Sequence, residues 1–506
     1  MELLIFHYHL KPGGVTSVIV DSIKAFLQDN DSWTVRVITG SSEDTEAFKN
    51  RLGVFAQRVI LQVEPLVGYA EEDLDEQDAS ERISDIKSLL ERLCDEERVF
   101  WIHNFHLGKN PYFTEAVIRL AQEGRQKIVL HVHDFPESGR YINLGRIRKY
   151  VKGPLYPTSN NVRYALINNR DVRILSHAGI PEDMIFLLDN PYHPLDFGEY
   201  TEEKKNSLQD VLKIGQNKKL FLSPVRAIRR KNILESALIS IMVDVVYGVS
   251  LPGTSGQEVH YSELVARCMR DTGNISSLGI TAENSGISFP SVLKSADSLI
   301  SSSVQEGFGY LFLQAIDSAR PLIARRLDII DGFDHIFENY PVFLYEHFFI
   351  PTGFFDINTE HIGKKYQKKI DKLASYVPES VTIELKEEIN NIVQKERVEF
   401  SFLPVEMQEK VLLKAYTDKE SIKAIKQENH GFAENVLSIV SQNIPNDAAT
   451  RLARFSLAFH KKTMQDIISS FDKIPVTSCS IEARETEETV LHSFARVDYL
   501  RLLYDF

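Results

Sequence analysis

The feature that most restricts the fold is an alternation of short apolar segments with longer segments of helical periodicity. Between the apolar segments, residues 15–28, 84–94 and 113–124 place apolar side chains at helical spacing. Strands that alternate with helices are typical of a parallel, doubly wound sheet, in which each strand is buried on both faces. We expect these strands in the first part of the chain: residues 2–6, 33–39, 58–64, 98–104, 127–133 and 162–168.

The same alternation begins again near residue 216 and fades near residue 355, which predicts a second α/β domain. Its expected strands are residues 218–227, 244–253, 273–279, 295–303 and 320–327. The polar stretch 193–217 is expected to be the linker. From residue 356 onward, long charged helical patterns dominate, without a strong strand signal. The prediction is α/β: two Rossmann-like doubly wound domains, residues 1–195 and 196–355, and a helical C-terminal extension, residues 356–506.

Charge and composition exclude several classes of protein. The 58 Lys and Arg residues against 71 Asp and Glu residues give a net charge of −13, which disfavours a nucleic-acid-binding surface. No apolar run reaches the roughly 18 residues of a transmembrane helix. The first residues lack the basic start of a signal peptide. Three cysteines, Cys94, Cys268 and Cys479, lie far apart, so we expect a cytoplasmic protein without a disulfide framework.

Two expected strand–helix junctions have sequences suited to anions. Gly13 and Gly14 follow the first strand, where glycine allows a ligand to approach the backbone and the next helix offers free N–H groups. On these two glycines alone, an ordinary tight turn is the favoured interpretation. After the first strand of the second domain comes Pro-Val-Arg-Ala-Ile-Arg-Arg-Lys-Asn (224–232), where Arg and Lys side chains suit phosphate oxygens. A solvated basic turn is an equally good interpretation of this segment.

A third junction carries a carboxylate and an amide on one helix face. Glu306-Gly307-Phe308-Gly309-Tyr310 follows an expected strand, and Gln314 lies eight residues after Glu306, about two helical turns away. Both side chains could hydrogen-bond sugar hydroxyls, and the alternative is an ordinary helix start. Taken together, the three junctions predict a site for a phosphorylated ligand.

With these motifs in view, residues 1–345 resemble the retaining glycosyltransferases of the GT-B fold, in the large family with sucrose-type and lipopolysaccharide-type enzymes. Arg226 and Lys231 match the family's Arg-x4-Lys pair, and Glu306-Gly307-Phe308-Gly309 matches the start of its Glu-x7-Glu motif. Gln314 departs from the second Glu of that motif. The resemblance implies two domains that face each other across a cleft, and last helices that pack back on the first domain.

The resemblance also implies roles for the matched residues. Four of them would be catalytic, namely Arg226, Lys231, Glu306 and His133. Donor-binding residues would be Gly13, Gly14, Gly307, Phe308, Gly309, Tyr310 and Gln314. The implied reaction transfers a sugar, with retention, from a UDP- or GDP-linked sugar to a small soluble polar or saccharide acceptor, with no obligatory cofactor.

Two polar loops of the first domain are candidates for the acceptor. They supply the residues His106, Lys109, Asn110, Asp134 and Arg140. The two cations suggest an acceptor that is small, polar and carboxylated, although surface salt bridges explain them equally well. The histidine spacing matches no zinc signature, so no metal is expected. A sugar phosphorylase or synthase on the same scaffold, or a degenerate transferase acting as a binding subunit, remain alternatives, and homo-oligomerisation is left open.

Overall fold

The computed structural model describes residues 1–30, 32–198, 201–215, 218–472 and 483–505. Cys479 lies outside these residues. The chain divides into two compact units, each with its own sheet. Unit 1 comprises Met1–His193 and Ala453–Ala495, and unit 2 comprises Pro194–Leu452 and Arg496–Phe506. The residues expected to form one helical extension are thus divided between the two units.

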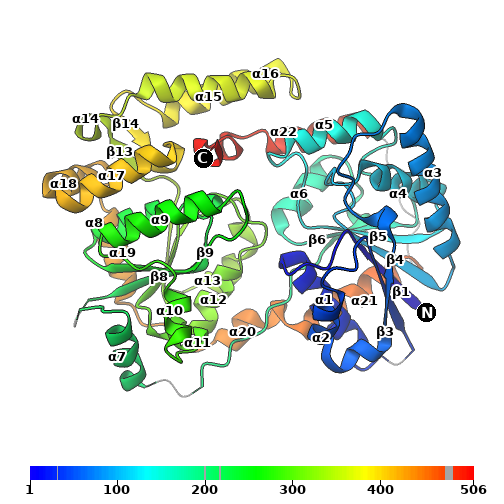
Figure 1. Ribbon diagram of the computed structural model, residues 1–506, viewed down its shortest axis with the longest axis horizontal. Coiled ribbons are helices and arrows are strands. Elements are labelled where there is room, and N and C mark those ends of the chain that lie inside the picture. Colours follow the sequence, from blue (N-terminus) through cyan, green and yellow to red (C-terminus); the bar gives the residue numbers. More distant parts are fainter. Residues whose placement is uncertain (31, 199–200, 216–217, 473–482, 506) are drawn as a thin grey trace. The chain divides into compact units, whose positions relative to one another are not determined.

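Unit 1 is built on a seven-stranded parallel sheet in the order β3-β2-β1-β4-β5-β6-β7 (Figure 1). Its strands are β1 (Glu2–His7), β2 (Thr34–Thr39), β3 (Val59–Val63), β4 (Arg98–His103), β5 (Lys127–Val132), β6 (Val162–Leu166) and β7 (Ile185–Leu187). Its helices are α1 (Gly14–Leu27), α2 (Thr45–Leu52), α3 (Glu76–Leu93), α4 (Pro111–Glu123), α5 (Tyr141–Tyr150), α6 (Asn169–His177), α21 (Leu457–Ser470) and α22 (Ala483–Phe494). The six strands expected in this region are confirmed, and β7 adds a short seventh.

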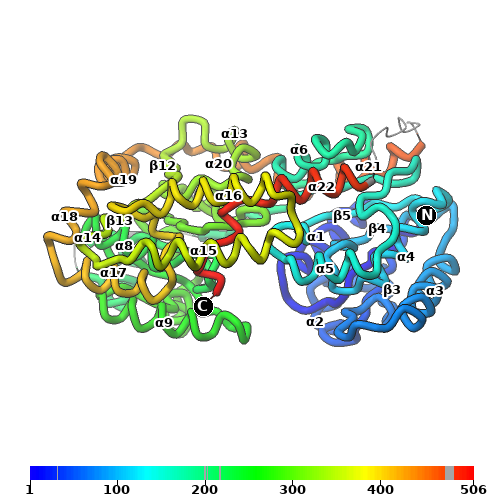
Figure 2. Tube along the Cα trace, turned by 90° about the horizontal axis from the view of Figure 1, so that it is seen from above, coloured from blue at the N-terminus to red at the C-terminus, as the bar shows by residue number. Residues whose placement is uncertain are grey.

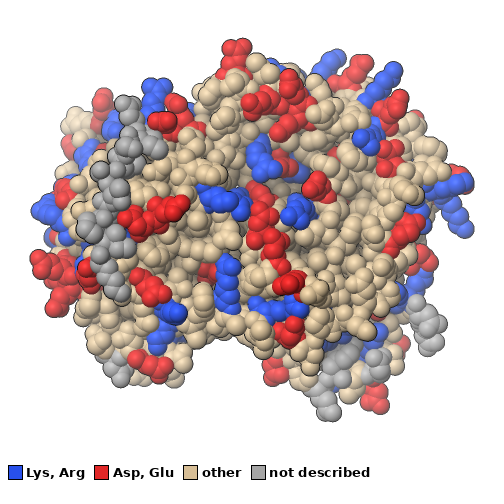
Figure 3. Space-filling view, turned by 180° about the vertical axis from the view of Figure 1, so that it is seen from behind, with Lys and Arg blue, Asp and Glu red and all other residues tan. Residues whose placement is uncertain are grey.

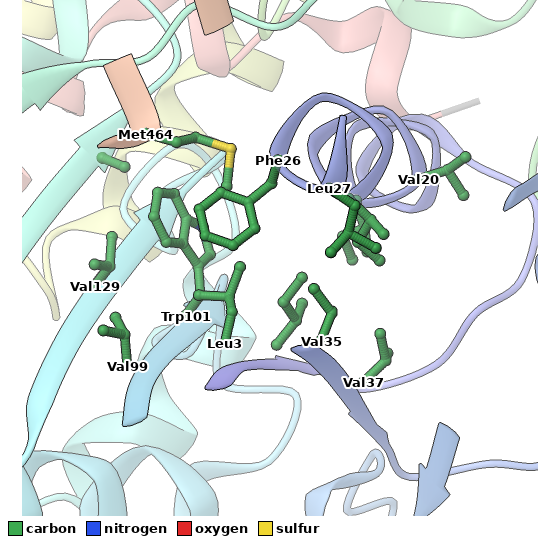
Figure 4. Packing of buried hydrophobic residues seen from close by; sticks show 14 of the residues in the cluster. Leu3, Val20, Phe26, Leu27, Val35, Val37, Val99, Trp101, Val129 and Met464 are labelled. Atoms are coloured by element: carbon green, nitrogen blue, oxygen red, sulfur yellow. The ribbon is translucent and has the colours of Figure 1, made fainter. Parts of the chain in front are cut away.

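The core of unit 1 includes side chains from the far end of the chain. Trp101 of β4 is buried beside Phe26 of α1, and Met464 of α21 packs against both in the same cluster (Figure 4). His460 of α21 bonds Ser22 of α1 over 2.8 Å. Figure 2 shows α22 lying along α6, in agreement with their contacts. Residues more than 300 positions apart therefore complete one hydrophobic core.

Unit 2 is built on a five-stranded parallel sheet in the order β12-β11-β10-β8-β9. Its strands are β8 (Leu220–Ala227), β9 (Val246–Pro252), β10 (Ser298–Ser301), β11 (Leu322–Arg325) and β12 (Val342–Tyr345). Its first helices are α7 (Glu202–Val211), α8 (Ile233–Met242), α9 (Val259–Asp271), α10 (Leu278–Asn284), α11 (Phe289–Ser295), α12 (Tyr310–Ser318) and α13 (Asp334–Phe337). Two parallel Rossmann-like sheets are thus present, as the sequence predicts.

Later helices complete unit 2, and a buried ion cluster joins its sheet to the segment that carries Glu399. These helices are α14 (Thr352–Phe355), α15 (Thr359–Leu373), α16 (Glu379–Ile392), α17 (Val405–Thr417), α18 (Lys419–Glu428), α19 (Phe432–Val440) and α20 (Ala448–Leu452). Arg325 of β11 lies 2.5 Å from Glu235 of α8 and 2.7 Å from Glu399, and all three side chains are buried. The buried cation between two carboxylates links the sheet to the segment that carries Glu399. Removing one partner would leave an unpaired buried charge.

Two local expectations are wrong. Residues 273–279 form no strand, because Ile275 makes a single bridge to Gly248 and α10 begins at Leu278. The division between the units, after His193, lies at the start of the expected linker 193–217, and the rest of that stretch contains helix α7, which buries Leu208. A short strand also occurs beyond residue 356: β14 (Arg397–Glu399) pairs antiparallel with β13 (Phe349–Pro351).

The last residues return to unit 2. Asp505 forms an ion pair with Lys369 of α15 over 2.7 Å, and the C-terminal turns lie beside this helix in Figure 2. Within the described part of the chain, no helix is long and apolar enough to span a membrane. On the face shown in Figure 3, acidic and basic side chains are interspersed.

Candidate functional site

The basic loop and the Glu-Gly-Phe-Gly loop lie side by side in unit 2. Strands β8 and β10 are parallel neighbours, so the loops that follow them meet at one edge of the sheet. The Val304 N–H donates to the Arg230 carbonyl over 2.9 Å. The Ser302 hydroxyl donates to the Asn232 carbonyl over 2.8 Å. These bonds join two segments that the sequence separates by about 70 residues.

A buried ion pair forms the centre of this site. Lys231 donates to one carboxylate oxygen of Glu306, and Arg230 lies 2.9 Å from the other. The Lys231 and Glu306 side chains are each 11% exposed. Burial would raise the pKa of Glu306, but Lys231 and Arg230 hold it at about 2. Glu306 is therefore ionised at neutral pH and fixed between two cations.

Local backbone geometry explains why these loops take this shape. Asn232 has a left-handed φ of 48° before α8, a conformation that Asn tolerates, and its amide donates to Glu235 over 2.8 Å. Gly309 precedes α12 with a φ of 106°, and an added Cβ would lie 2.7 Å from the Phe312 ring. Only glycine fits at position 309 without displacing that ring.

The remaining cations of the basic loop differ in their surroundings. Arg229 donates to Glu258 over 3.2 Å and to the Tyr504 carbonyl over 2.8 Å, so it holds the C-terminal segment in place. Arg226 is exposed at the end of β8 and reaches the Thr254 hydroxyl over 3.3 Å. Of these two arginines, Arg226 is the one whose guanidinium a ligand can reach.

The predicted donor residues after Glu306 start helix α12. Phe308 is buried, with its ring centroid 5.7 Å from that of Phe333 and 5.1 Å from that of Tyr310. Gln314 is half-buried on the same helix. Phe308 thus anchors the loop in the core, and its neighbours Gly307 and Gly309 share the backbone turn beside Glu306.

The two glycines of unit 1 lie between β1 and α1. Gly13 is the residue before the helix, where no side chain caps the first turn, and its backbone is extended. An added Cβ would meet nothing within 4 Å at Gly14 and only one atom, at 3.8 Å, at Gly13. The packing of the protein itself therefore does not require glycine here, which leaves room for a ligand beside the helix N–H groups.

Three buried histidines meet at the ends of β4 and β5, a cluster that sequence spacing did not reveal. The strand register places His103 opposite His131, and His133 lies 2.9 Å from His103 between ring nitrogens. One ligand nitrogen from each lies within 4.8 Å of the others. The signal was present in the two expected strands 98–104 and 127–133, each of which carries a histidine at its last or next-to-last residue.

The hydrogen bonds of this cluster favour neutral, hydrogen-bonded rings. The indole N–H of Trp101 donates to His131 Nδ1 over 3.1 Å, so the proton of the neutral His131 ring is on Nε2. A metal at Nε2 would need a lone pair on that atom. Burial lowers the pKa of His133 to about 4 and places those of His103 and His131 further below the usual value.

Two of the predicted acceptor residues have structural contacts within unit 1. His106 is fully buried, with its ring 5.5 Å from Phe135 and 5.7 Å from Tyr156, and burial lowers its pKa to about 3. Asn110 caps helix α4: its side-chain oxygen accepts from the Phe113 N–H over 3.0 Å. The sequence indicated polar loops but not which of their side chains point inward.

The other predicted acceptor residues lie around an exposed tyrosine. We call His9, Tyr69, Lys109 and Arg140 the Tyr69 cluster. The Lys109 ammonium lies 5.5 Å from the Tyr69 ring centroid, and the Tyr69 hydroxyl lies 3.1 Å from His9 Nε2. The pKa of Lys109 is lowered by burial and by the positive charges of Arg140 and Arg146. Arg140 also pairs with Asp134 over 3.1 Å.

The ion pair generates a pH-dependent prediction. In Glu306→Gln, Lys231 loses its counter-ion, so its pKa, which burial already lowers, falls further. The folded state then binds fewer protons than the unfolded state over the alkaline range below the ordinary lysine pKa of about 10.4. The free energy of unfolding of unit 2 should therefore rise with pH across this range, more steeply than in the wild type.

Urea unfolding followed by circular dichroism measures this change. Both tryptophans, Trp33 and Trp101, belong to unit 1, so their fluorescence reports on that unit separately. If the free energy of unfolding of unit 2 changed equally with pH in the variant and in the wild type, the result would contradict the proposed role of the ion pair.

No protein-family model matches the chain. Over 527 aligned residues it is 30% identical to mannosylglucosyl-3-phosphoglycerate synthase of Petrotoga mobilis, with 100% of both chains covered. Among solved structures, the lipopolysaccharide outer core galactosyltransferase WaaB matches with a TM-score of 0.51 and 12% identity over 93% of this chain and 99% of that one. Anabaena Alr3699/HepE in complex with UDP matches with a TM-score of 0.48 and 13% identity over 93% and 100%.

Proposed function

Since the chain belongs to the family of mannosylglucosyl-3-phosphoglycerate synthase, a GT-B nucleotide-sugar glycosyltransferase, we propose that it makes the product for which that relative is named. The reaction would transfer a mannosyl group from a UDP- or GDP-linked sugar to glucosyl-3-phosphoglycerate, with retention of configuration. The observation that carries this proposal is 30% identity over the full length of both chains.

In the proposed donor site, Lys231 and Arg226 bind the diphosphate. Arg230 pairs with the second carboxylate oxygen of Glu306, so Glu306 stays neutralised when Lys231 turns toward phosphate oxygens. Positive charge placed in advance beside a leaving diphosphate stabilises the charge that develops there in the transition state. The diphosphate can then accept the proton of the acceptor hydroxyl on the face where attack occurs.

The other predicted residues are assigned to binding. Glu306 and the backbone of Gly307 and Gly309 would hold the donor sugar, while Gln314 would bond the nucleotide ribose through its amide. Phe308 supports this turn from the core, and Tyr310 begins the helix that follows. In unit 1, we keep Gly13, Gly14 and His133 as residues that contact the substrates.

Activity assays test the donor site. We expect Arg226→Ala and Lys231→Ala each to lower kcat by about 10²–10³-fold, because each removes charge that stabilises the leaving group. Product formation from glucosyl-3-phosphoglycerate is measured with GDP-mannose and with UDP-sugars as donors. Arg125→Ala, which removes an exposed cation of unit 1, is the matched control and should leave the rate unchanged.

Several outcomes would overturn the assignment. Near wild-type rates in either variant would remove the diphosphate role. Phosphorolysis of a disaccharide without any nucleotide donor would favour a sugar phosphorylase. Donor binding without turnover in the wild type would favour a degenerate binding subunit.

The Tyr69 cluster supports an acidic acceptor. The 3-phosphoglycerate part of the proposed acceptor carries a phosphate and a carboxylate, and Lys109 and Arg140 offer two cations on one edge of the unit 1 sheet. Hydrogen bonds between charged groups contribute about 1.5–3 kcal/mol each. We expect Lys109→Ala and Arg140→Ala each to raise the acceptor KM by roughly ten- to a hundredfold at unchanged donor KM.

Steady-state kinetics with two acceptors distinguish this role from a structural one. Glucosylglycerate lacks the phosphate. With this acceptor, the difference in acceptor KM from the wild type should shrink for whichever of the two variants has lost the phosphate contact. An unchanged acceptor KM in both variants would remove the cluster from the acceptor site.

A further inference from the structure

Unit 2 contains a cavity at the edge of its sheet opposite the proposed donor site. The cavity has a volume of about 680 Å³. One wall is formed by residues just before β8 and β9, together with the end of α8 and residues 272–274. The other wall is formed by α17 and α18, which pack beside α8 (Figure 1). The loops around Lys231 and Glu306 follow the carboxyl ends of β8 and β10, so the two sites lie at opposite edges of one sheet.

Lysines dominate the charge of this cavity. Helix α18 presents Lys419, Lys423 and Lys426 at positions i, i+4 and i+7, which share one helix face. Lys218 faces them from the other wall and pairs with Asp244 over 2.6 Å. Lys423 pairs with Glu420 over 3.6 Å, a distance typical of a weak, exposed ion pair. In a chain of net charge −13, this is a local concentration of positive charge.

The lysines are arranged along a line, and apolar groups lie beside them. Seven residues of helix span about 10 Å, which is longer than a single phosphate group. Ile241, Met242 and Val245 line the inner wall, and Tyr416 is 49% exposed at the rim. A ligand for this cavity therefore needs an extended anionic part and a flat or apolar part.

We propose that this cavity binds a nucleotide that carries two or more phosphates, at a site separate from the donor site. The phosphates lie along Lys419, Lys423 and Lys426, and the base lies against Tyr416 and the apolar wall. The volume falls within the range of about 300–1,000 Å³ that is usual for small-molecule sites. Because the two sites lie at opposite edges of the sheet, a nucleotide here does not compete with the sugar nucleotide.

Hydrogen exchange with ATP as the probe tests this proposal. ATP should slow amide exchange in residues 241–247 and 415–426 of the full chain, including when the donor nucleotide is present at saturation. The triple variant Lys419→Ala/Lys423→Ala/Lys426→Ala should bind ATP at least tenfold more weakly. A matched control, Lys364→Ala/Lys365→Ala/Lys368→Ala, removes three exposed charges from α15 in the same unit and should keep wild-type affinity.

Further variants make the outcome decisive. AMP should bind at least tenfold more weakly than ATP, and Tyr416→Ala should weaken ATP binding while the lysines remain. The proposal is overturned if ATP leaves exchange in residues 415–426 unchanged. It is also overturned if both triple variants lose affinity equally, since that would indicate general attraction to a basic protein surface, or if donor nucleotide displaces the ATP.

Discussion

The ion pair between Lys231 and Glu306 is the interaction on which the proposed chemistry depends. It joins two loops that come from different parts of the sequence, and it forms only because β8 and β10 are parallel neighbours. Two buried charges are stable together because each compensates the other, and Arg230 adds a second cation to the carboxylate. The site thus keeps positive charge at a sheet edge, where open α/β folds bind ligands.

The cations that the sequence grouped together divide into different roles in the structure. Arg229 is held by Glu258 and by the carbonyl of Tyr504, so it stabilises the return of the chain end to unit 2. Arg226 and Lys231 are the pair that the proposed function needs. In unit 1, His106 and Asn110 are used by the fold, whereas Lys109 and Arg140 surround an exposed tyrosine. An acidic acceptor fits this second group.

Sequence patterns predicted the elements better than the contacts between them. Long apolar strands such as β4 and β5 are visible because burial on both faces leaves an uninterrupted apolar run. Short strands such as β7 and β12 are half-buried and were not predicted. Residues 273–279 were predicted as a strand, although this segment begins and ends with glycine. Local periodicity carries no information about which strand lies beside which.

The site shows the same limit. Its motif residues could be identified through their resemblance to a known family, and the structure shows that Lys231 pairs with Glu306. The histidine cluster, by contrast, depends on the register of β4 against β5, and the helix that completes the unit 1 core is separated from it by more than 250 residues. Such contacts follow from the packing of the whole chain.

The central claim is that the buried Lys231 binds the donor diphosphate. Nucleotide affinity measured in the wild type and in Lys231→Met tests this claim most directly. At fixed salt concentration, we expect the substitution to weaken binding of the nucleoside diphosphate by at least tenfold and to leave the Kd of the corresponding nucleoside monophosphate within about twofold. An equal loss for both nucleotides, or no loss for the diphosphate, would contradict the account.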